Sequence, residues 1–267
     1  MADVAGDRVE DLEPARIDRR YVERIIHRSL RRLGVDALDL VQFHWWDFAI
    51  PRYVEAMAWL AVLKDQGKIR HLGVTNFDEV HLAELVDSGA EILSNQVQYS
   101  VLDRRPGKAL ADYCLRNGIA LLCYGALAGG FLSEGYRSMS EPPRDLENRS
   151  LVKYRLIIEE IGGWSRYQSV LEALHDAADR AGVPIAAAAL RYVLDRPGVA
   201  ATITGVDSVR QADELLSALT VSLPGSEEEA LNRLLADIQP PPGPVYGLER
   251  DVKGPHGAIM RYNLNRT

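Results

Sequence analysis

The sequence predicts an α/β protein in which helices cover a sheet of parallel strands. Short apolar runs of strand length alternate with stretches of helical periodicity, and this alternation repeats five times along the chain. Gly, Asp and Asn residues bound the apolar runs, as they do at the ends of strands and helices. Consecutive strands separated by a helix are expected to pair in parallel, because such a crossover brings the chain back to the same end of the sheet.

The elements follow from local signals taken in chain order. Apolar residues recur at helical spacing over residues 21–33, and Gly34 follows as a stop. An apolar run over residues 38–43 is predicted to be the first strand, and Gly67 separates the next helix from the second strand. The further predicted elements are helix 53–66, strand 69–74, helix 80–87, strand 92–98, helix 107–117, strand 119–124, strand 200–204 and helix 208–219.

Two segments depart from the alternation. The connection over residues 125–148 contains Pro142-Pro143, and loops of this length are usually functional. Additional helical patterns follow it before the last strand. The tail from Pro240 is rich in Pro and Gly, and we expect it to pack as irregular structure.

Composition excludes several classes of function. Of the 267 residues, 47% are hydrophobic and 26% are charged, which is typical of a globular protein with a sizeable core. A net charge of −7 argues against a nucleic-acid or anionic-membrane surface, and the Arg28–Arg32 cluster is interpreted as a solvated helix face. Cys114 and Cys123 lack metal-ligand or CxxC spacing. With no signal peptide and no apolar stretch of spanning length, the sequence predicts a cytoplasmic location.

Polar and aromatic residues follow the predicted strands at their carboxyl ends. In parallel α/β folds the ligand site lies at that edge, so the sequence predicts a pocket there. The residues concerned are His44-Trp45-Trp46-Asp47, Thr75-Asn76-Phe77, Gln96 with Gln98 and Tyr99, Tyr124-Gly125, and Gly205-Val206-Asp207.

Four phrases resemble the aldo-keto reductase family in its order and spacing: SLRRLGVDALDLVQFHWWD, GKIRHLGVTNF, SNQVQYSVLDRR and LLCYGALAGGFLSEGY. The resemblance covers roughly Arg20 to Leu219. It implies an NAD(P)H-dependent oxidoreductase that reduces carbonyl groups and is built on a (β/α)8 TIM-type barrel. About five parallel strands are present, so the expected fold is an incomplete barrel that begins near the family's fourth strand. We expect residues 1–267 to form a single domain of this type, truncated at its N-terminus relative to the family.

The resemblance also implies roles for individual residues. His44 matches the active-site histidine that hydrogen-bonds the substrate carbonyl oxygen, and Tyr124 matches the aromatic residue that stacks on the nicotinamide ring. Such an arrangement accelerates hydride transfer by holding the reactants close. The other matched positions are Thr75, Asn76 and Gln96 for the carboxamide, Gly125, Leu127 and Gly129 in the pyrophosphate loop 125–132, and Gly205, Gln211 and Glu214 in the adenosine-phosphate segment.

Structural alternatives exist for several of these residues. A histidine at the end of a strand is commonly structural, and Trp45 and Trp46 fit either the walls of a substrate pocket or plain packing beneath a loop. Tyr124 on its own would be a core residue, but the GALAGG that follows it favours cofactor stacking. The remaining histidines show no metal-ligand spacing, so no metal site is predicted.

The family's proton donor has no counterpart in this sequence. In the family, a tyrosine acts as the acid with a lysine and an aspartate, all from the first strands of the barrel. Here the first lysine is Lys64 on a predicted helix, and Tyr21 is the only tyrosine before the first strand. Five strands cannot close a barrel, so both edges of the predicted sheet would be left open. Three explanations remain: the N-terminal segment or the tail covers the edges, two chains pair as a homo-oligomer, or the reading frame begins too late in a normal gene.

Two substitutions bear on the cofactor. Asp207 lies where the family commonly has a basic residue near the 2′-phosphate, and Leu215 stands where an asparagine commonly clamps the adenine. Together with the missing acid, these substitutions predict that the chain binds NADPH weakly, binds NADH with a smaller penalty, and does not reduce small carbonyl compounds at a useful rate. Two alternatives are a redox-independent lyase, isomerase or cyclase that uses His44 with Asp47 or Tyr99, and a non-catalytic binding subunit.

Overall fold

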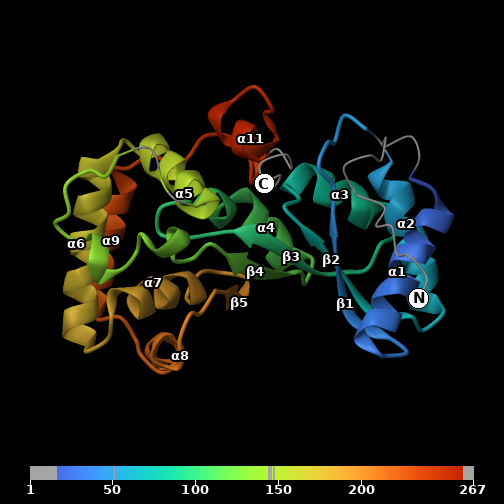
Figure 1. Cartoon of the computed structure of the whole chain (residues 1–267), viewed down its shortest axis with the longest axis horizontal. Coiled ribbons are helices and arrows are strands. Elements are labelled where there is room, and N and C mark those ends of the chain that lie inside the picture. The colour runs from blue at the N-terminus through green and yellow to red at the C-terminus, as the bar shows by residue number, and fades with distance from the viewer. Residues whose placement is uncertain (1–16, 51, 144–145, 147, 261–267) are drawn as a thin grey trace, which may run out of the picture. The chain divides into compact units, whose positions relative to one another are not determined.

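The computed structural model describes residues 17–50, 52–143, 146 and 148–260. They belong to two compact units. The first unit extends to Leu93 and the second runs from Ser94 to Met260, so the boundary falls within the third strand. Each unit contains parallel strands flanked by helices (Figure 1).

The first unit alternates helices with two paired strands. Its first helix begins where the Asp18 carboxylate accepts a hydrogen bond of 2.7 Å from the Tyr21 N–H, and it ends at Gly34 in the left-handed region. The two strands pair in parallel, with His44 opposite Thr75 at their carboxyl ends. The elements are α1 (Arg19–Leu33), β1 (Leu38–His44), α2 (Tyr53–Asp65), β2 (Ile69–Thr75) and α3 (Glu79–Asp87).

The second unit contains three parallel strands and most of the helices. The register places Tyr124 opposite Gln98 on one side and opposite Ile203 on the other. The elements are β3 (Ile92–Gln98), η3 (Arg105–Gly107), α4 (Ala109–Arg116), β4 (Ala120–Tyr124), η4 (Ala128–Gly130), η5 (Glu134–Tyr136), α5 (Arg149–Glu160), α6 (Trp164–Ala181), α7 (Ile185–Leu194), β5 (Val199–Ile203), α8 (Val209–Leu216), η6 (Ser217–Leu219), α9 (Gly225–Ala236), α10 (Gly247–Arg250) and α11 (Pro255–Ile259). Helix α6 packs against α7 and α9 (Figure 1).

The predicted α/β class with five parallel strands is confirmed. Strand and helix bounds differ from the sequence expectation by no more than two residues, except that the predicted helix 208–219 is α8 followed by the 3-10 turn η6. The expectation of an irregular tail is wrong, since α10 and α11 form within it. The N-terminal residues 1–16 and the last residues 261–267 lie outside the described part of the chain.

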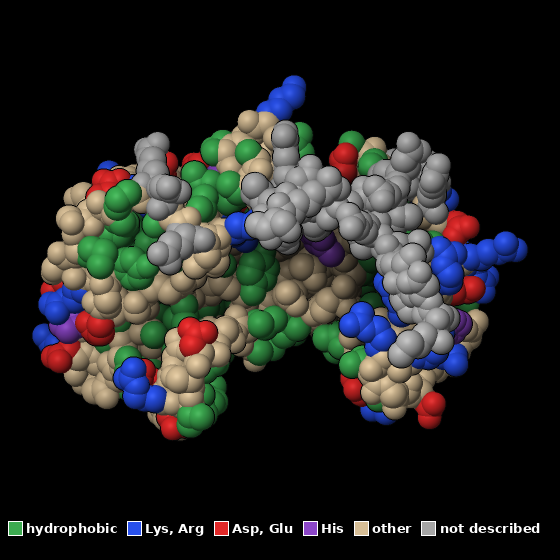
Figure 2. Space-filling model, viewed as in Figure 1, with side chains coloured by type: hydrophobic (Ala, Val, Ile, Leu, Met, Phe, Trp, Pro, Cys, Tyr) green, Lys and Arg blue, Asp and Glu red, His purple; other side chains and the backbone are tan. Residues whose placement is uncertain are grey.

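On the face shown in Figure 2, acidic and basic side chains are interspersed over both units. Among the described residues, no helix is both long enough and apolar enough to cross a membrane.

Candidate functional site

The carboxyl ends of β1 and β2 carry the predicted catalytic histidine. His44 is exposed at the last position of β1 and lies opposite Thr75 in the parallel register. Asn76 follows Thr75 and is only 4% exposed. Its φ of 60° lies in the left-handed region, which asparagine tolerates better than most residues. The chain therefore turns sharply at the end of β2, and the Asn76 side chain is buried at the turn.

The two tryptophans after His44 have different environments. Trp45 is 6% exposed, and its indole N–H donates to the carbonyl oxygens of Asp47 at 2.9 Å and Ile50 at 3.1 Å. Trp46 is half-buried, with its ring edge-to-face against His44 at a centroid distance of 6.2 Å. Trp45 thus packs beneath the loop, whereas Trp46 is the tryptophan that contacts the histidine.

A pocket of about 340 Å³ lies in the second unit, between the loop after β4 and the segment after β5. It gathers five of the predicted cofactor residues: Gly125, Leu127, Gly129, Gly205 and Gln211. The other lining residues are Ala126, Gly130, Ser150, Tyr154, Ile203, Thr204 and Asp207. Both segments follow strand carboxyl ends, where the sequence predicts the site.

Two glycines in this pocket are required by the packing of α5. Gly125 and Gly129 both have positive φ, 70° and 67°, a conformation that strains other residues. A Cβ atom at Gly125 would collide with the Tyr154 hydroxyl, and one at Gly129 would lie 2.7 Å from Tyr154 Cδ2. Side chains at these positions would fill the space between the loop and α5. The two glycines therefore let the loop pack closely on α5, and both line the pocket.

The charge in the pocket is negative. Asp207 is the one charged residue among those that line it. The Asp207 N–H donates to the Gln211 side-chain oxygen at 2.6 Å. This hydrogen bond stabilises the turn that precedes α8. Glu214 is not among the lining residues and pairs with Arg210 at 2.8 Å. The pocket therefore offers backbone and amide groups, but no side-chain cation, to an anionic ligand.

The remaining predicted residues of the second unit lie on β3 and β4. Tyr124 ends β4, and its carbonyl oxygen accepts from the Tyr99 N–H at 3.0 Å. Gln96 is half-buried in the middle of β3, opposite Leu122. Tyr99 is 3% exposed, and burial raises the pKa of its phenol, so this alternative acid is held in its protonated form.

Sequence reasoning missed the contribution of α5 and of a buried ion network. Ser150 and Tyr154 reach the pocket from α5, and no local sequence signal indicates that a helix so far along the chain packs on the glycine loop. Arg105 bonds Asp103 at 2.6 Å and Glu249 at 3.2 Å, and all three side chains are at most 2% exposed. The motif LDRR and the tail GLERD contain these charges, and only the fold shows that they meet.

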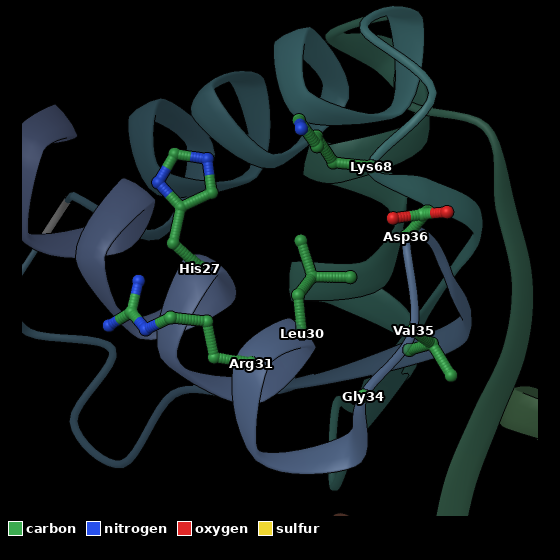
Figure 3. A pocket seen from close by; sticks show the side chains of 7 residues that line it. All are labelled: His27, Leu30, Arg31, Gly34, Val35, Asp36 and Lys68. Carbon is green, nitrogen blue, oxygen red and sulfur yellow. The ribbon is translucent and has the colours of Figure 1, made fainter.

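A second pocket of about 320 Å³ lies in the first unit, at the amino ends of β1 and β2. Figure 3 shows Leu30 between His27 and Lys68, with Asp36 to one side. This pocket is at the end of the strands opposite to that of His44 and Thr75. In the described part of the chain, no three His, Cys, Asp or Glu side chains gather as a metal site would require.

Comparison with known proteins identifies the family. The profile of the Aldo/keto reductase family matches residues 9–236, a longer stretch than the sequence phrases alone covered. A glycerol dehydrogenase of Gluconobacter oxydans has a similar structure, with a TM-score of 0.70 and 27% identity over 90% of this chain and 71% of that chain. The chain therefore belongs to the aldo/keto reductase family.

Curated relatives are distant and longer. Flagellar radial spoke protein 5 of Chlamydomonas reinhardtii is 33% identical over 60% of this chain and 34% of its own length. The NADH-specific methylglyoxal reductase of Escherichia coli (strain K12) is 27% identical over 79% of this chain and 63% of its own length. The chain thus spans from about a third to less than two thirds of the length of these two relatives.

Proposed function

We propose that this member of the aldo/keto reductase family binds a nicotinamide dinucleotide in the pocket of the second unit and reduces small carbonyl compounds slowly. The observation that carries the proposal is the gathering of Gly125, Leu127, Gly129, Gly205 and Gln211 around one pocket. These are the residues to which the family resemblance gives the pyrophosphate and adenosine roles. When bound, the dinucleotide supplies the hydride for reduction.

The pocket favours NADH over NADPH. The two cofactors differ by the 2′-phosphate, and Asp207 supplies a carboxylate to the adenosine-phosphate segment where the family commonly has a cation. The missing charge-assisted hydrogen bond alone costs roughly 1.5–3 kcal/mol, which is about ten- to a hundred-fold in affinity. Repulsion between the carboxylate and the phosphate adds to this cost.

The other assigned residues orient the reacting groups. Within the second unit, Tyr124 supplies the ring on which the nicotinamide stacks, and Gln96 hydrogen-bonds its carboxamide. His44 hydrogen-bonds the substrate carbonyl oxygen and so favours charge development on that oxygen. The alkoxide must still receive a proton, and the sequence offers no counterpart of the family's tyrosine, lysine and aspartate. General acid catalysis typically contributes about 10²–10⁴-fold, so reduction by this chain is slow.

The proposal is tested by fluorescence titration of the 267-residue chain with NADH and NADPH, followed by assays on a panel of small aldehydes. We expect NADH to bind more tightly than NADPH and turnover to be slow. Micromolar NADPH binding with rapid, steady turnover would contradict both the cofactor preference and the missing acid.

The His44→Ala variant tests the assigned role of the histidine. Because His44 is exposed, we expect the variant to lose the remaining activity with little change in melting temperature. A large fall in melting temperature, with activity per folded molecule unchanged, would instead identify His44 as a structural residue.

A further inference from the structure

The pocket at the amino ends of β1 and β2 brings together three basic side chains. His27 and Arg31 come from α1, and Lys68 immediately precedes β2. In Figure 3 the side chain of Leu30 lies among them, with His27 and Arg31 on the left and Lys68 above. The volume of about 320 Å³ lies at the lower end of the range for small-molecule sites. The pocket thus has room for a small ligand beside three groups that can donate hydrogen bonds.

These three side chains lack acidic partners. Within the described residues, none of them forms an ion pair with a carboxylate. Arg19, at the start of the same helix, pairs with Glu23 at 2.8 Å. Arg31 has no acid at this spacing, because the residues four positions before and after it are His27 and Val35. The sequence therefore denies Arg31 the kind of partner that it gives to Arg19.

The positive charges of this cluster repel one another. His27 and Arg31 are four residues apart on α1, so they lie on the same face of the helix. Like charges at this spacing destabilise a helix whenever the histidine is protonated. Lys68 adds a further cation to the same pocket. An anion bound among the three side chains would relieve this repulsion.

Negative charge faces the pocket from another side. Asp36 also lines the pocket, but in Figure 3 its carboxylate lies to the right of Leu30, and the Lys68 ammonium group points away from it. The N–H groups of Gly34 and Val35 both donate to the Leu30 carbonyl oxygen, at 2.9 and 3.1 Å, so these amides are not available to a ligand. The other carbonyl groups at the end of α1 and the Asp36 carboxylate accept hydrogen bonds and repel anions. A matching ligand therefore presents an anionic group on one side and hydrogen-bond donors on the other.

We propose that this pocket binds a small phosphate ester that also carries hydroxyl groups. The phosphate group lies among His27, Arg31 and Lys68, and the hydroxyl groups donate to the Asp36 carboxylate. Leu30 adds apolar surface for the carbon skeleton. None of these residues lines the pocket of the second unit, so the proposal goes beyond the proposed reductase function and does not depend on it.

A phosphate group matches the three basic side chains better than a carboxylate does. A phosphate ester carries a charge of about −1.5 to −2 at pH 7 and three strong acceptor oxygens, whereas a carboxylate carries a single charge on two oxygens. The Arg31 guanidinium can donate two parallel hydrogen bonds to phosphate, and the Lys68 ammonium group acts as a compact charge. The His27 ring donates from an N–H. Three donor groups of the protein thus correspond to three oxygens of the ligand.

The experiment titrates the full chain with glycerol 3-phosphate, without any dinucleotide, and follows the imidazole signals of its six histidines by NMR. The His27→Gln variant identifies the His27 signal. We expect a saturable shift of that signal, with glycerol 3-phosphate binding several-fold more tightly than inorganic phosphate, because only the ester has hydroxyl groups for Asp36. An unchanged His27 signal, or equal affinities for the ester and for inorganic phosphate, would overturn the proposal.

Two neighbouring arginines provide a matched pair of variants. Arg31→Gln removes a lining side chain and should weaken glycerol 3-phosphate binding several-fold. Arg32→Gln removes the same charge from the next residue, which is not among the lining residues, and should change the affinity little. Both arginines are exposed, so both variants should retain the melting temperature of the unsubstituted chain. Equal losses of affinity would overturn the proposal, because the charge of α1 as a whole, and not the pocket, would then attract the ester.

NADH separates this site from the proposed dinucleotide pocket. With NADH present, glycerol 3-phosphate should shift the His27 signal as before, since the two pockets share no lining residue. Displacement of the ester by NADH would overturn the proposal. Failure of NADH to bind would refute the proposed function, but it would leave the titration without dinucleotide and the comparison of the two arginine variants unchanged.

Discussion

The ends of the strands are stabilised by aromatic packing in the first unit and by buried charge in the second. In the first unit, Phe77 is fully buried, with its ring centroid 5.1 Å from that of Phe48 and 6.0 Å from that of Tyr53. In the second unit, the Asp103–Arg105–Glu249 network is almost completely excluded from solvent. The two units therefore meet the same requirement, fixing loops at strand ends, by different physical means.

This difference determines how much stability each unit loses when a single side chain is replaced. Aromatic packing is graded, because replacing a ring by a smaller apolar group removes contacts in proportion to the lost volume. A buried ion network is closer to all-or-none, because removing one partner leaves an uncompensated charge in a poorly solvated site. Substitutions in the two regions should therefore differ in size even where each removes a single side chain.

The largest expected effect is that of Arg105→Met. The substitution leaves the buried carboxylates of Asp103 and Glu249 without their bonded cation, and breaking such a pair costs about 3–5 kcal/mol. Unfolding of the second unit can be followed by thiol labelling, since Cys114 and Cys123 are its two buried cysteines. Burial raises the pKa of both thiols to about 12, so they should be unreactive near pH 8 until the unit unfolds.

A surface ion pair in the same unit provides the control. Arg137 bonds Glu172 at 2.9 Å, but their side chains are 34% and 51% exposed. Arg137→Met should lower the free energy of unfolding by no more than about 1 kcal/mol, since solvent screens such pairs. Equal losses for the two variants would show that the buried network does not behave as an uncompensated charge site.

A smaller effect is expected from Phe77→Leu in the first unit. Leucine retains most of the apolar volume, so the loss in free energy of unfolding should be at most about 1.5 kcal/mol. Tryptophan fluorescence reports mainly on this unit, because it holds Trp45, Trp46 and Trp59 of the four tryptophans in the chain. Urea denaturation followed by this signal measures the loss.

Val80→Ala on α3 is the matched control for Phe77→Leu. Val80 is 60% exposed, so its truncation should change the stability of the unit by no more than about 0.5 kcal/mol. If Phe77→Leu proves as costly as Arg105→Met, aromatic packing at this position is not graded and the contrast between the two units fails.

The strands and their order were predictable because their signals are local. The apolar run 38–43 has strand length, and Gly34 and Gly67 punctuate the helices on either side. The tail was not predictable, because its Pro and Gly content indicates irregular structure while its short helices depend on tertiary contacts. Glu249 of α10 is fully buried and bonds Arg105, which lies far away in the sequence.

The candidate site was predictable where backbone conformation dictates residue type. Gly125 and Gly129 must be glycine because their φ angles are positive and Tyr154 approaches them closely. The sequence GALAGG contains both of these glycines, so the loop could be recognised before the structure was known. The contact from Tyr154 leaves no comparable mark, since an aromatic residue on an amphipathic helix normally indicates core packing. The same holds for the cation–π contacts of Lys153, because its three tyrosine rings come from separate parts of the chain.

The smallest expected effect concerns an exposed charge in the second unit. Asp207 lines the candidate cofactor pocket but is exposed, so solvent screens its repulsion of an anionic ligand. By analogy with exposed ion pairs, removing this charge in Asp207→Asn is worth about 0.2–1 kcal/mol, which is at most about a fivefold gain in affinity. Titrations at low salt should show tighter NADPH binding and little change for NADH.

Asp213→Asn on α8 separates a local effect from a general change in charge. Asp213 is exposed on the same helix that follows the pocket but is not among the lining residues. Because both variants gain one unit of positive charge, a shared increase in NADPH affinity would mean that net charge, not the position of Asp207, governs binding. A gain confined to Asp207→Asn that fades as salt is raised would identify this carboxylate as the group that opposes the 2′-phosphate, since screening weakens only the Coulombic part of the interaction.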